Sequence, residues 1–402
     1  MNTPRLLLLT SYAPDMRYAG GEAIRKLVGR FPADRIRWAS LHARRDASAL
    51  PFEHRSFVPR QLHWRLRRTV WNAFHTDEWQ AARLARDIAA WLGGDRPEVL
   101  WVVPELGAVN VAYHLAAALN LPVHATIHDA WETARFIVPP LYYPVYAARM
   151  NRLLAASASV DAISKELLAR LRTRFPHLSE ADGMVLPPSI PRANMVPDAG
   201  PMALPATGSR RRIGFCGSMR VSAVQWQAFL ALLGRLPYEF EIVSYAYDGL
   251  SHDVPRPGNV AIAARPFAET ESTLIRELGS AGLHGCYLGL WKEPARRLFG
   301  QTSLSAKLAS YAAAGCPIIV DGPADSAAWL LVRQYGAGVL CGEDEEPSRL
   351  ALDRLFGDET TRLSLAAGAA RMCREEFELE RNVERFRELL GRTARGQCTE
   401  AP

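Results

Sequence analysis

The chain has 402 residues, which is too long for a single ordinary hydrophobic core and predicts two domains. Its 49% hydrophobic and 22% charged residues are typical of a soluble globular protein. The net charge of +6 suits anionic ligands or an anionic membrane face, but it does not by itself indicate nucleic acid. The only early apolar run, residues 6–9, is too short for a signal peptide or a membrane span, so we expect a cytoplasmic protein.

All six cysteines lie in the second half of the chain, and no two of them have C-x-x-C spacing. Several fall within apolar, strand-like runs. The pattern predicts buried, reduced thiols and gives no support for a metal site or a disulfide framework.

Strands and helices alternate along the first half of the chain. Strands are predicted at residues 5–10, 36–41, 99–103, 123–127 and 160–163, and helices at residues 22–30, 78–92, 109–119, 142–156 and 165–175. Repeated βα units predict a parallel sheet with helices on both faces.

A second alternation follows a stretch rich in Pro, Gly, Ala and Ser, which places a linker and domain boundary near residues 190–209. Strands are predicted at residues 213–216, 240–244, 259–263, 286–290, 318–320 and 338–341, and helices at residues 223–233, 271–278, 304–314, 328–334, 347–356 and 377–390. The second half therefore repeats the architecture of the first.

Residues 301–320 read as one helix that runs into a buried strand. Thr302 or Ser303 is the expected N-cap, because a side-chain oxygen can accept from the unpaired N–H groups of the first turn. Gly315 stands where a left-handed closing residue is needed, and Pro317 prevents the helix from continuing.

Lys307 falls in the N-terminal half of this helix, where the partial positive charge of the first turn disfavours a cation. A bound anion would resolve the conflict, because helix N-termini and ammonium groups both attract phosphate. Ser303 and Ser310 share a helical stripe with Lys307. Together they predict an anion site, and the alternative is a lysine that simply faces water.

Two strand-to-helix loops carry small residues. Gly20 and Gly21 follow the first strand, while Gly217 and Ser218 follow the first strand of the second half, with Arg220 shortly after. Glycines let the backbone approach a ligand closely, and a guanidinium at such a place can grip a diphosphate. Either loop could also be an ordinary turn.

His128 and Asp129 directly follow the predicted strand at residues 123–127. In open α/β sheets ligands bind at the carboxyl ends of strands, so this histidine is a candidate for contact with a substrate. A histidine bound to nearby backbone is the alternative.

Basic and apolar residues are interleaved between residues 54 and 74. They are Arg55, Arg60, Arg65, Arg67 and Arg68 with Phe57, Leu62, Trp64, Val70, Trp71 and Phe74. Such a segment suits a helix that lies on an anionic membrane surface. Nucleic-acid binding, and an ordinary arginine-rich helix and loop packed on the domain, are the alternatives.

Several signatures are absent from the sequence: G-x-G-x-x-G, the P-loop, H-E-x-x-H, G-x-S-x-G and D-x-D. Dinucleotide redox, NTPase, metalloprotease and hydrolase functions therefore lack their usual marks.

Residues 305–319 read Ser-Ala-Lys-Leu-Ala-Ser-Tyr-Ala-Ala-Ala-Gly-Cys-Pro-Ile-Ile. They resemble the Pro-Ser-Lys-Leu-x-Glu-Tyr-x-Ala-x-Gly-x-Pro-Val-Ile motif of glycosyltransferase family 4, a group of GT-B enzymes that use nucleotide sugars. Supporting similarities lie at Gly20-Gly21, at residues 126–129, 156–165, 185–187 and 215–218, and in the closing helix.

The resemblance covers nearly the whole chain and implies the GT-B fold. That fold is α/β, with two Rossmann-like, doubly wound domains facing a central cleft and a C-terminal helix that crosses back to the N-terminal domain. We expect an acceptor domain over residues 1–195, a linker over 196–209, a nucleotide-sugar donor domain over 210–375 and the crossing helix over 376–394.

The resemblance also implies a metal-independent hexosyltransferase that needs no cofactor and transfers a sugar with retention. Its donor is a nucleoside diphosphate sugar, and its acceptor a glycan or lipid-linked molecule of cell-envelope polysaccharide synthesis. His128, Lys307 and Arg220 are the implied catalytic residues. Donor contacts are implied for Gly217, Ser218, Thr302, Ser303, Ser305 and Ser310, and acceptor or sugar contacts for Gly20, Gly21 and Asp129. No metal or nucleic acid is expected, and the region of residues 55–68 is expected to touch the inner face of the cell membrane.

The sequence departs from the family at its Glu-x7-Glu pair, which would fall on Thr302 and Ser310. A hydroxyl can replace a carboxylate in these contacts only with a weaker bond. The competing hypotheses are a non-catalytic GT-B protein that binds a glycan or a partner, and a GT-B sugar-nucleotide epimerase. The epimerase hypothesis ranks low, because its chemistry needs acid–base carboxylates that the aligned positions lack.

Overall fold

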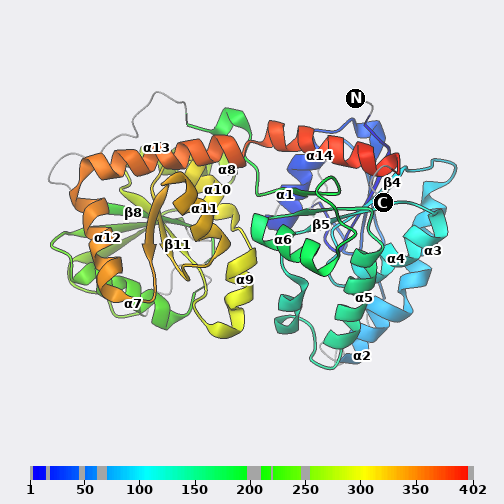
Figure 1. Cartoon of the computed structure of the whole chain (residues 1–402), viewed down its shortest axis with the longest axis horizontal. Coiled ribbons are helices and arrows are strands. Elements are labelled where there is room, and N and C mark those ends of the chain that lie inside the picture. The colour runs from blue at the N-terminus through cyan, green and yellow to red at the C-terminus, as the bar shows by residue number, and fades with distance from the viewer. Residues whose placement is uncertain are drawn as a thin grey trace. The chain divides into compact units, whose positions relative to one another are not determined.

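The computed structural model describes residues 3–14, 19–44, 50–60, 70–196, 210–218, 221–245 and 254–396. The chain divides into two compact units (Figure 1). Unit 1 comprises Met1–Leu186 with Arg381–Pro402, and unit 2 comprises Pro187–Glu380. The division thus falls nearer the N-terminus than the expected boundary at residue 195, and the predicted linker lies outside the described residues apart from Val196.

Unit 1 is built on a seven-stranded sheet whose described pairs are all parallel. Its strands are β1 (Leu6–Thr10), β2 (Ile36–Ser40), β3 (Glu53–Ser56), β4 (Val99–Val102), β5 (Val123–Ile127), β6 (Ser159–Ala162) and β7 (Gly183–Val185). The spatial order is β3-β2-β1-β4-β5-β6-β7. This is the strand order of the Rossmann fold with one further strand, so its switch point lies between β1 and β4.

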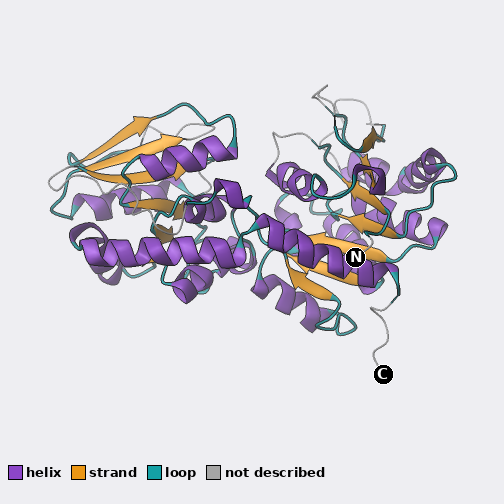
Figure 2. Cartoon of the chain, turned by 90° about the horizontal axis from the view of Figure 1, so that it is seen from above, coloured by secondary structure: helices purple, strands orange, loops and turns teal. Residues whose placement is uncertain are grey.

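Helices connect these strands and lie on both sides of the sheet (Figure 2). They are α1 (Ala19–Val28), η1 (Ala33–Arg35), α2 (Val70–Ala73), the π-helical turn η3 (Phe74–Trp79), α3 (Ala81–Leu92), α4 (Ala108–Leu119), η4 (Trp131–Phe136), α5 (Tyr143–Ala155) and α6 (Lys165–Arg174). Helix α1 begins earlier than predicted, so Gly20 and Gly21 lie inside its first turn and not in the preceding loop.

The last helix, α14 (Leu379–Ala394), supplies side chains to the core of unit 1, as the GT-B fold requires. The fully buried Phe386 ring lies 4.9 Å from the Trp101 ring and 5.1 Å from the His124 ring. Near the helix end, Thr393 Oγ1 and Ser159 Oγ are hydrogen-bonded at 2.6 Å. Aromatic contacts of this kind add to the free energy gained from burying the rings.

Unit 2 repeats the same design with a six-stranded sheet, again parallel at every described pair. Its strands are β8 (Arg211–Cys216), β9 (Phe240–Tyr245), β10 (Val260–Ala264), β11 (Gly285–Gly289), β12 (Ile318–Asp321) and β13 (Gly338–Cys341). The order β10-β9-β8-β11-β12-β13 is the Rossmann order, with its switch point between β8 and β11.

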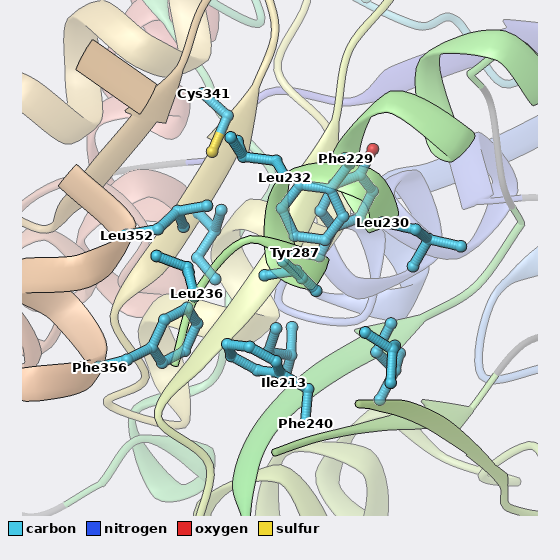
Figure 3. Close-up of a cluster of buried hydrophobic side chains, with 14 of the residues drawn as sticks. Ile213, Phe229, Leu230, Leu232, Leu236, Phe240, Tyr287, Cys341, Leu352 and Phe356 are labelled. Atoms are coloured by element: carbon cyan, nitrogen blue, oxygen red, sulfur yellow. The ribbon is translucent and has the colours of Figure 1, made fainter. Parts of the chain in front are cut away.

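The helices of unit 2 include two that sequence reasoning missed, α9 and α13. Its elements are η5 (Arg192–Asn194), α7 (Ala223–Gly234), α8 (Glu271–Ser280), η6 (Pro294–Arg296), α9 (Arg297–Thr302), α10 (Ala306–Ala313), α11 (Ala327–Tyr335), α12 (Glu345–Gly357) and α13 (Glu359–Glu376). Side chains of α7 and α12 pack with the strands into a buried apolar cluster around Phe229, Tyr287 and Phe356 (Figure 3).

The five cysteines within the described residues are buried free thiols, as predicted; the sixth, Cys398, lies outside them. No helix of the described chain is both long enough and apolar enough to span a membrane.

Candidate functional site

The N-cap of helix α10 is Ser305, and not Thr302 or Ser303 as predicted. The Ser305 side chain accepts from the backbone N–H of Lys307 at 3.4 Å, which is an N-cap contact. The prediction was wrong because residues 297–302 form the separate helix α9. Thr302 is the last residue of α9, and its hydroxyl donates to the Leu298 carbonyl at 2.8 Å.

Lys307 therefore lies in the first turn of α10, closer to the helix N-terminus than the sequence suggested. Its half-buried ammonium donates to the carbonyl oxygen of Ser218 and lies 4.8 Å from the centroid of the Phe215 ring. Both contacts belong to β8 and the loop after it. The side chain thus joins the start of α10 to the carboxyl end of β8, beside the switch point of the sheet.

Gly217 is fitted closely to this lysine. Its φ of +72° lies in the left-handed region that favours glycine, and a Cβ built there would lie only 3.0 Å from Lys307 Cε. The sequence reasoning singled out Gly217 and Ser218 for close backbone approach to a ligand. The structure gives a second explanation for glycine at position 217: a larger residue there would collide with the Lys307 side chain. Arg220, the other predicted cation of this loop, lies outside the described residues.

Two further contacts fix α10 against the sheet. Tyr311, which is fully buried, accepts from the backbone N–H of Cys216 at 3.1 Å through its hydroxyl. At the other end of the helix Gly315 has a φ of +67°, as predicted for a left-handed closing residue. The sequence analysis did not identify Tyr311 as a structural contact of this site. Its position four residues after Lys307 was the available signal, because it places both side chains on one side of the helix.

The predicted donor-binding hydroxyls are largely turned inward. Ser310 is 5% exposed, and its hydroxyl donates to the Ala306 carbonyl at 3.3 Å within the helix. Thr302 and Ser303 are buried as well. Thr302 and Ser310, on which the resemblance would place a Glu-x7-Glu pair, therefore carry hydroxyls that already have partners in the chain.

A charged cluster that the sequence reasoning missed lies at the carboxyl ends of β11 and β12. Asp321, which is 2% exposed, pairs with Lys292 Nζ at 2.6 Å and accepts from the Tyr287 hydroxyl at 2.7 Å. Gln225, in the first turn of α7, also donates to this carboxylate at 3.2 Å. A charged residue directly after the apolar run of β12 was the available signal.

Unit 1 places its own polar residues at the carboxyl edge of its sheet. His128 directly follows β5 and is half-buried, with Nδ1 4.0 Å from Glu105 Oε1. Asp129 beside it is exposed. Gly20 lies near Tyr12, since a Cβ at this glycine would lie 3.5 Å from the tyrosine hydroxyl oxygen. These residues come from the loops after β1, β4 and β5, which the Rossmann order brings to one edge.

Asp77 is a further polar residue of unit 1 that sequence reasoning missed, and it lies in the π-helical turn η3. Its carboxylate accepts from the Thr76 hydroxyl at 2.8 Å, and a Cβ at Gly107 would lie 3.1 Å from Asp77 Oδ1. Burial raises the pKa of Asp77 to about 6, with neighbouring Glu78 adding to the shift and Thr76 and His42 opposing it. Isolated π-turns occur frequently at functional sites.

No protein-family model matches the sequence, and no curated protein matches it. Solved structures are similar in fold. HepE from Anabaena in complex with UDP has a TM-score of 0.65 at 12% identity, covering 96% of this chain and 99% of that one. Sucrose-phosphate synthase from Thermosynechococcus elongatus has a TM-score of 0.67 at 13% identity, covering 96% and 98%. WaaG, a glycosyltransferase involved in lipopolysaccharide biosynthesis, has a TM-score of 0.60 at 13% identity, covering 96% and 99%.

These similarities extend over nearly the full length of the chain, and at such identities they are similarities of fold. With two parallel Rossmann-like sheets and α14 returning to unit 1, the chain has the GT-B fold, as the sequence predicted.

The raised pKa of Asp77 gives a testable dependence of stability on pH. The folded-state pKa of about 6 exceeds the ordinary value of 3.8, so the folded protein holds this proton more tightly than the unfolded chain. Below pH 4 both states are protonated and the residue has no effect. As the pH rises from 4 to 6, the unfolded chain loses this proton before the folded protein does, so the free energy of unfolding falls. The total loss at neutral pH is at most about 3 kcal/mol.

Asp77→Asn should therefore gain stability relative to the wild type as the pH rises from 4 to 7, measured by urea unfolding at each pH. Asp87→Asn on the exposed face of α3 serves as the matched control. If the difference between Asp77→Asn and the wild type does not change with pH, the carboxyl is not held in its proton-bound form.

Proposed function

We propose that the chain is a glycosyltransferase of the family 4 type, which transfers a sugar from a nucleoside diphosphate sugar to a glycan or lipid-linked acceptor. The observation that carries the proposal is the position of Lys307, in the first turn of α10 and against the loop after β8. Support also comes from HepE, whose solved structures contain UDP and UDP-glucose, and from WaaG, which acts in lipopolysaccharide biosynthesis.

In this proposal unit 2 binds the donor. The diphosphate lies at the N-terminus of α10, where the positive end of the helix dipole attracts an anion. The Lys307 ammonium and the backbone of Gly217 and Ser218 complete the site. Negative charge grows on the diphosphate as the bond to the sugar breaks, and these preorganised groups stabilise it. We propose that they do so without a metal ion.

Unit 1 would supply the acceptor contacts. His128 and Asp129 stand at the carboxyl edge of its sheet, where a hydroxyl-bearing acceptor can be oriented by hydrogen bonds. We propose His128 for contact with the sugar or acceptor and Arg220 for contact with the diphosphate. Gly20 and Gly21 would let the acceptor approach the start of α1. Retention at the anomeric carbon, a cytoplasmic location and a role in envelope polysaccharide synthesis are part of the same proposal.

Exposed apolar residues give unit 1 a candidate membrane surface. Trp71 is 61% exposed, Ile137 is 77% exposed and Leu141 is 78% exposed. The two segments that carry them are in contact, because the Phe74 and Tyr142 rings lie 5.1 Å apart. Exposed Arg55, Arg60 and Arg135 belong to the same unit. The predicted Arg65, Arg67 and Arg68 lie outside the described residues. Apolar side chains among arginines suit an anionic lipid surface.

The donor site is tested by Lys307→Ala. Loss of one charge-assisted contact to the diphosphate should weaken binding of UDP by about 10- to 150-fold, corresponding to about 1.5–3 kcal/mol. Isothermal titration calorimetry measures this directly. Lys165→Ala is the matched control, because Lys165 lies in the first turn of α6 behind the N-cap Ser164 in unit 1.

UDP affinity that is unchanged in Lys307→Ala would refute the site assignment. If UDP binds the wild type but no sugar is ever transferred from UDP-sugars to glycan or lipid-linked acceptors, the chain is instead a non-catalytic GT-B binding protein. The hydroxyls at positions 302 and 310 are the reason to make that measurement.

The membrane surface is tested by flotation with vesicles. Ile137→Ser and Leu141→Ser should lower the recovery of protein with anionic vesicles, and high salt should lower that of the wild type, because screening weakens attraction between exposed charges. Val224→Ser in unit 2 is the control, since Val224 is also 78% exposed. Equal recovery with neutral and anionic vesicles would contradict the electrostatic part of the proposal.

A further inference from the structure

Three buried N–H donors belong to residues at the amino-terminal edge of the sheet in unit 2, close enough for the charges of Arg211 and Arg362 to act on His284. They are Nε of Arg211, the first residue of β8, Nε2 of His284, which directly precedes β11, and Nε of Arg362 on α13. Within the described chain none of the three atoms has a hydrogen-bond partner. His284 is fully buried, and Arg362 is only 6% exposed. A buried donor that is left unsatisfied destabilises the folded state.

The hydrogen bond to the other ring nitrogen fixes the role of His284. Its Nδ1 accepts from the backbone N–H of Arg212 at 3.1 Å, so the proton of the neutral ring is on Nε2, which is therefore a donor. Burial lowers the pKa of His284 most, and the charges of Arg362, Arg211 and Arg212 lower it further. Together they bring it to about 3. The ring is thus neutral at physiological pH and lies in a field of positive charge.

Three nearby carboxylates have hydrogen-bond partners elsewhere. Glu241 pairs with Arg212 at 2.8 Å, and Asp353 accepts from the Tyr238 hydroxyl at 2.9 Å. Asp358 caps α13 by accepting from the N–H groups of Thr360 and Thr361. Burial lowers the pKa of Arg362, and Arg211 adds to this, while Glu359 and Asp358 act in the opposite direction without forming an ion pair with it. A buried guanidinium without a paired carboxylate is strongly unfavourable.

We propose that Arg211, His284 and Arg362 bind a small tetrahedral oxyanion of the phosphate type. Two guanidinium groups and one ring N–H offer the convergent donors that such an anion needs, and guanidinium geometry suits phosphate oxygens. Aromatic rings lie beside two of these residues. The Arg211 guanidinium lies 5.1 Å from the Tyr238 ring centroid, and the His284 ring lies 6.2 Å from the Phe356 ring.

This site is separate from the proposed donor site. Arg211 opens β8, whereas the loop that contacts Lys307 follows the last residue of β8, so the two sites lie at opposite edges of one sheet. An anion held here would link α13 to the starts of β8 and β11. We therefore expect the oxyanion to raise the stability of unit 2, whether or not a nucleotide-sugar donor is bound.

Thermal unfolding with inorganic phosphate, at ionic strength held constant with sodium chloride, tests the inference. The midpoint should keep rising with the logarithm of the phosphate concentration once phosphate exceeds the dissociation constant. At tenfold excess over the dissociation constant, the rise should be about 3–6 °C for a unit of this size. Arg362→Met should abolish the rise. Arg211→Met is the second variant if Arg362→Met fails to fold, and Arg349→Met on the exposed face of α12 is the matched control.

Lys307→Ala separates this site from the donor site, because phosphate bound beside Lys307 would give a response that this variant loses. The inference predicts that Lys307→Ala keeps the full response to phosphate and that Arg362→Met keeps its affinity for UDP. It is overturned if phosphate raises the midpoint no more than chloride, if Arg362→Met and Arg211→Met respond like the wild type, or if the response disappears in Lys307→Ala.

Discussion

The contact between the Lys307 ammonium and the Ser218 carbonyl is the interaction on which the proposed donor site of unit 2 depends. It holds a cation in the first turn of α10, where the helix dipole opposes it. The surrounding chain is shaped to permit this. Gly217 leaves room for the lysine, the Phe215 ring covers its ammonium, and Tyr311 binds the helix to the end of β8. Two sources of positive charge are thereby fixed at one place before any ligand arrives.

The two units use the same strand order for different chemistry. In unit 2 the carboxyl edge carries fixed positive charge at Lys307, and Lys292, in the loop after β11, is held by Asp321 at the end of β12. In unit 1 the corresponding edge carries His128, and Asp77, whose pKa is raised by burial, lies beside the loop after β4. The first set suits a diphosphate, and the second suits hydroxyl groups that exchange hydrogen bonds. A fold with two such sheets can divide donor and acceptor binding between them.

The regular alternation of apolar and helical segments made most of this fold predictable from sequence. The exceptions have physical causes. Strand β3, Glu53–Ser56, is short and polar and, among the described strands, pairs with β2 alone, so it lacks the apolar run by which buried strands are identified. Only three residues, 303–305, separate α9 from α10, and the prediction of a single helix therefore placed the N-cap too early. The π-turn that presents Asp77 has no sequence signature, because one extra residue per turn leaves composition unchanged.

The predicted roles of Lys307 and Gly217 rested on charge and backbone freedom, which sequence does reveal. The inward hydrogen bond of Ser310 depends on a side-chain rotamer, which sequence does not reveal.

Hydrogen–deuterium exchange in the presence and absence of UDP tests the central claim most directly, because it reports which amides a diphosphate covers. The account predicts that UDP slows exchange at Gly217 and Ser218 and in the first turn of α10, residues 306–308, with little change at the amino-terminal ends of β8 and β11. Protection elsewhere, with the amides around Lys307 exchanging at the same rate with and without UDP, would contradict it.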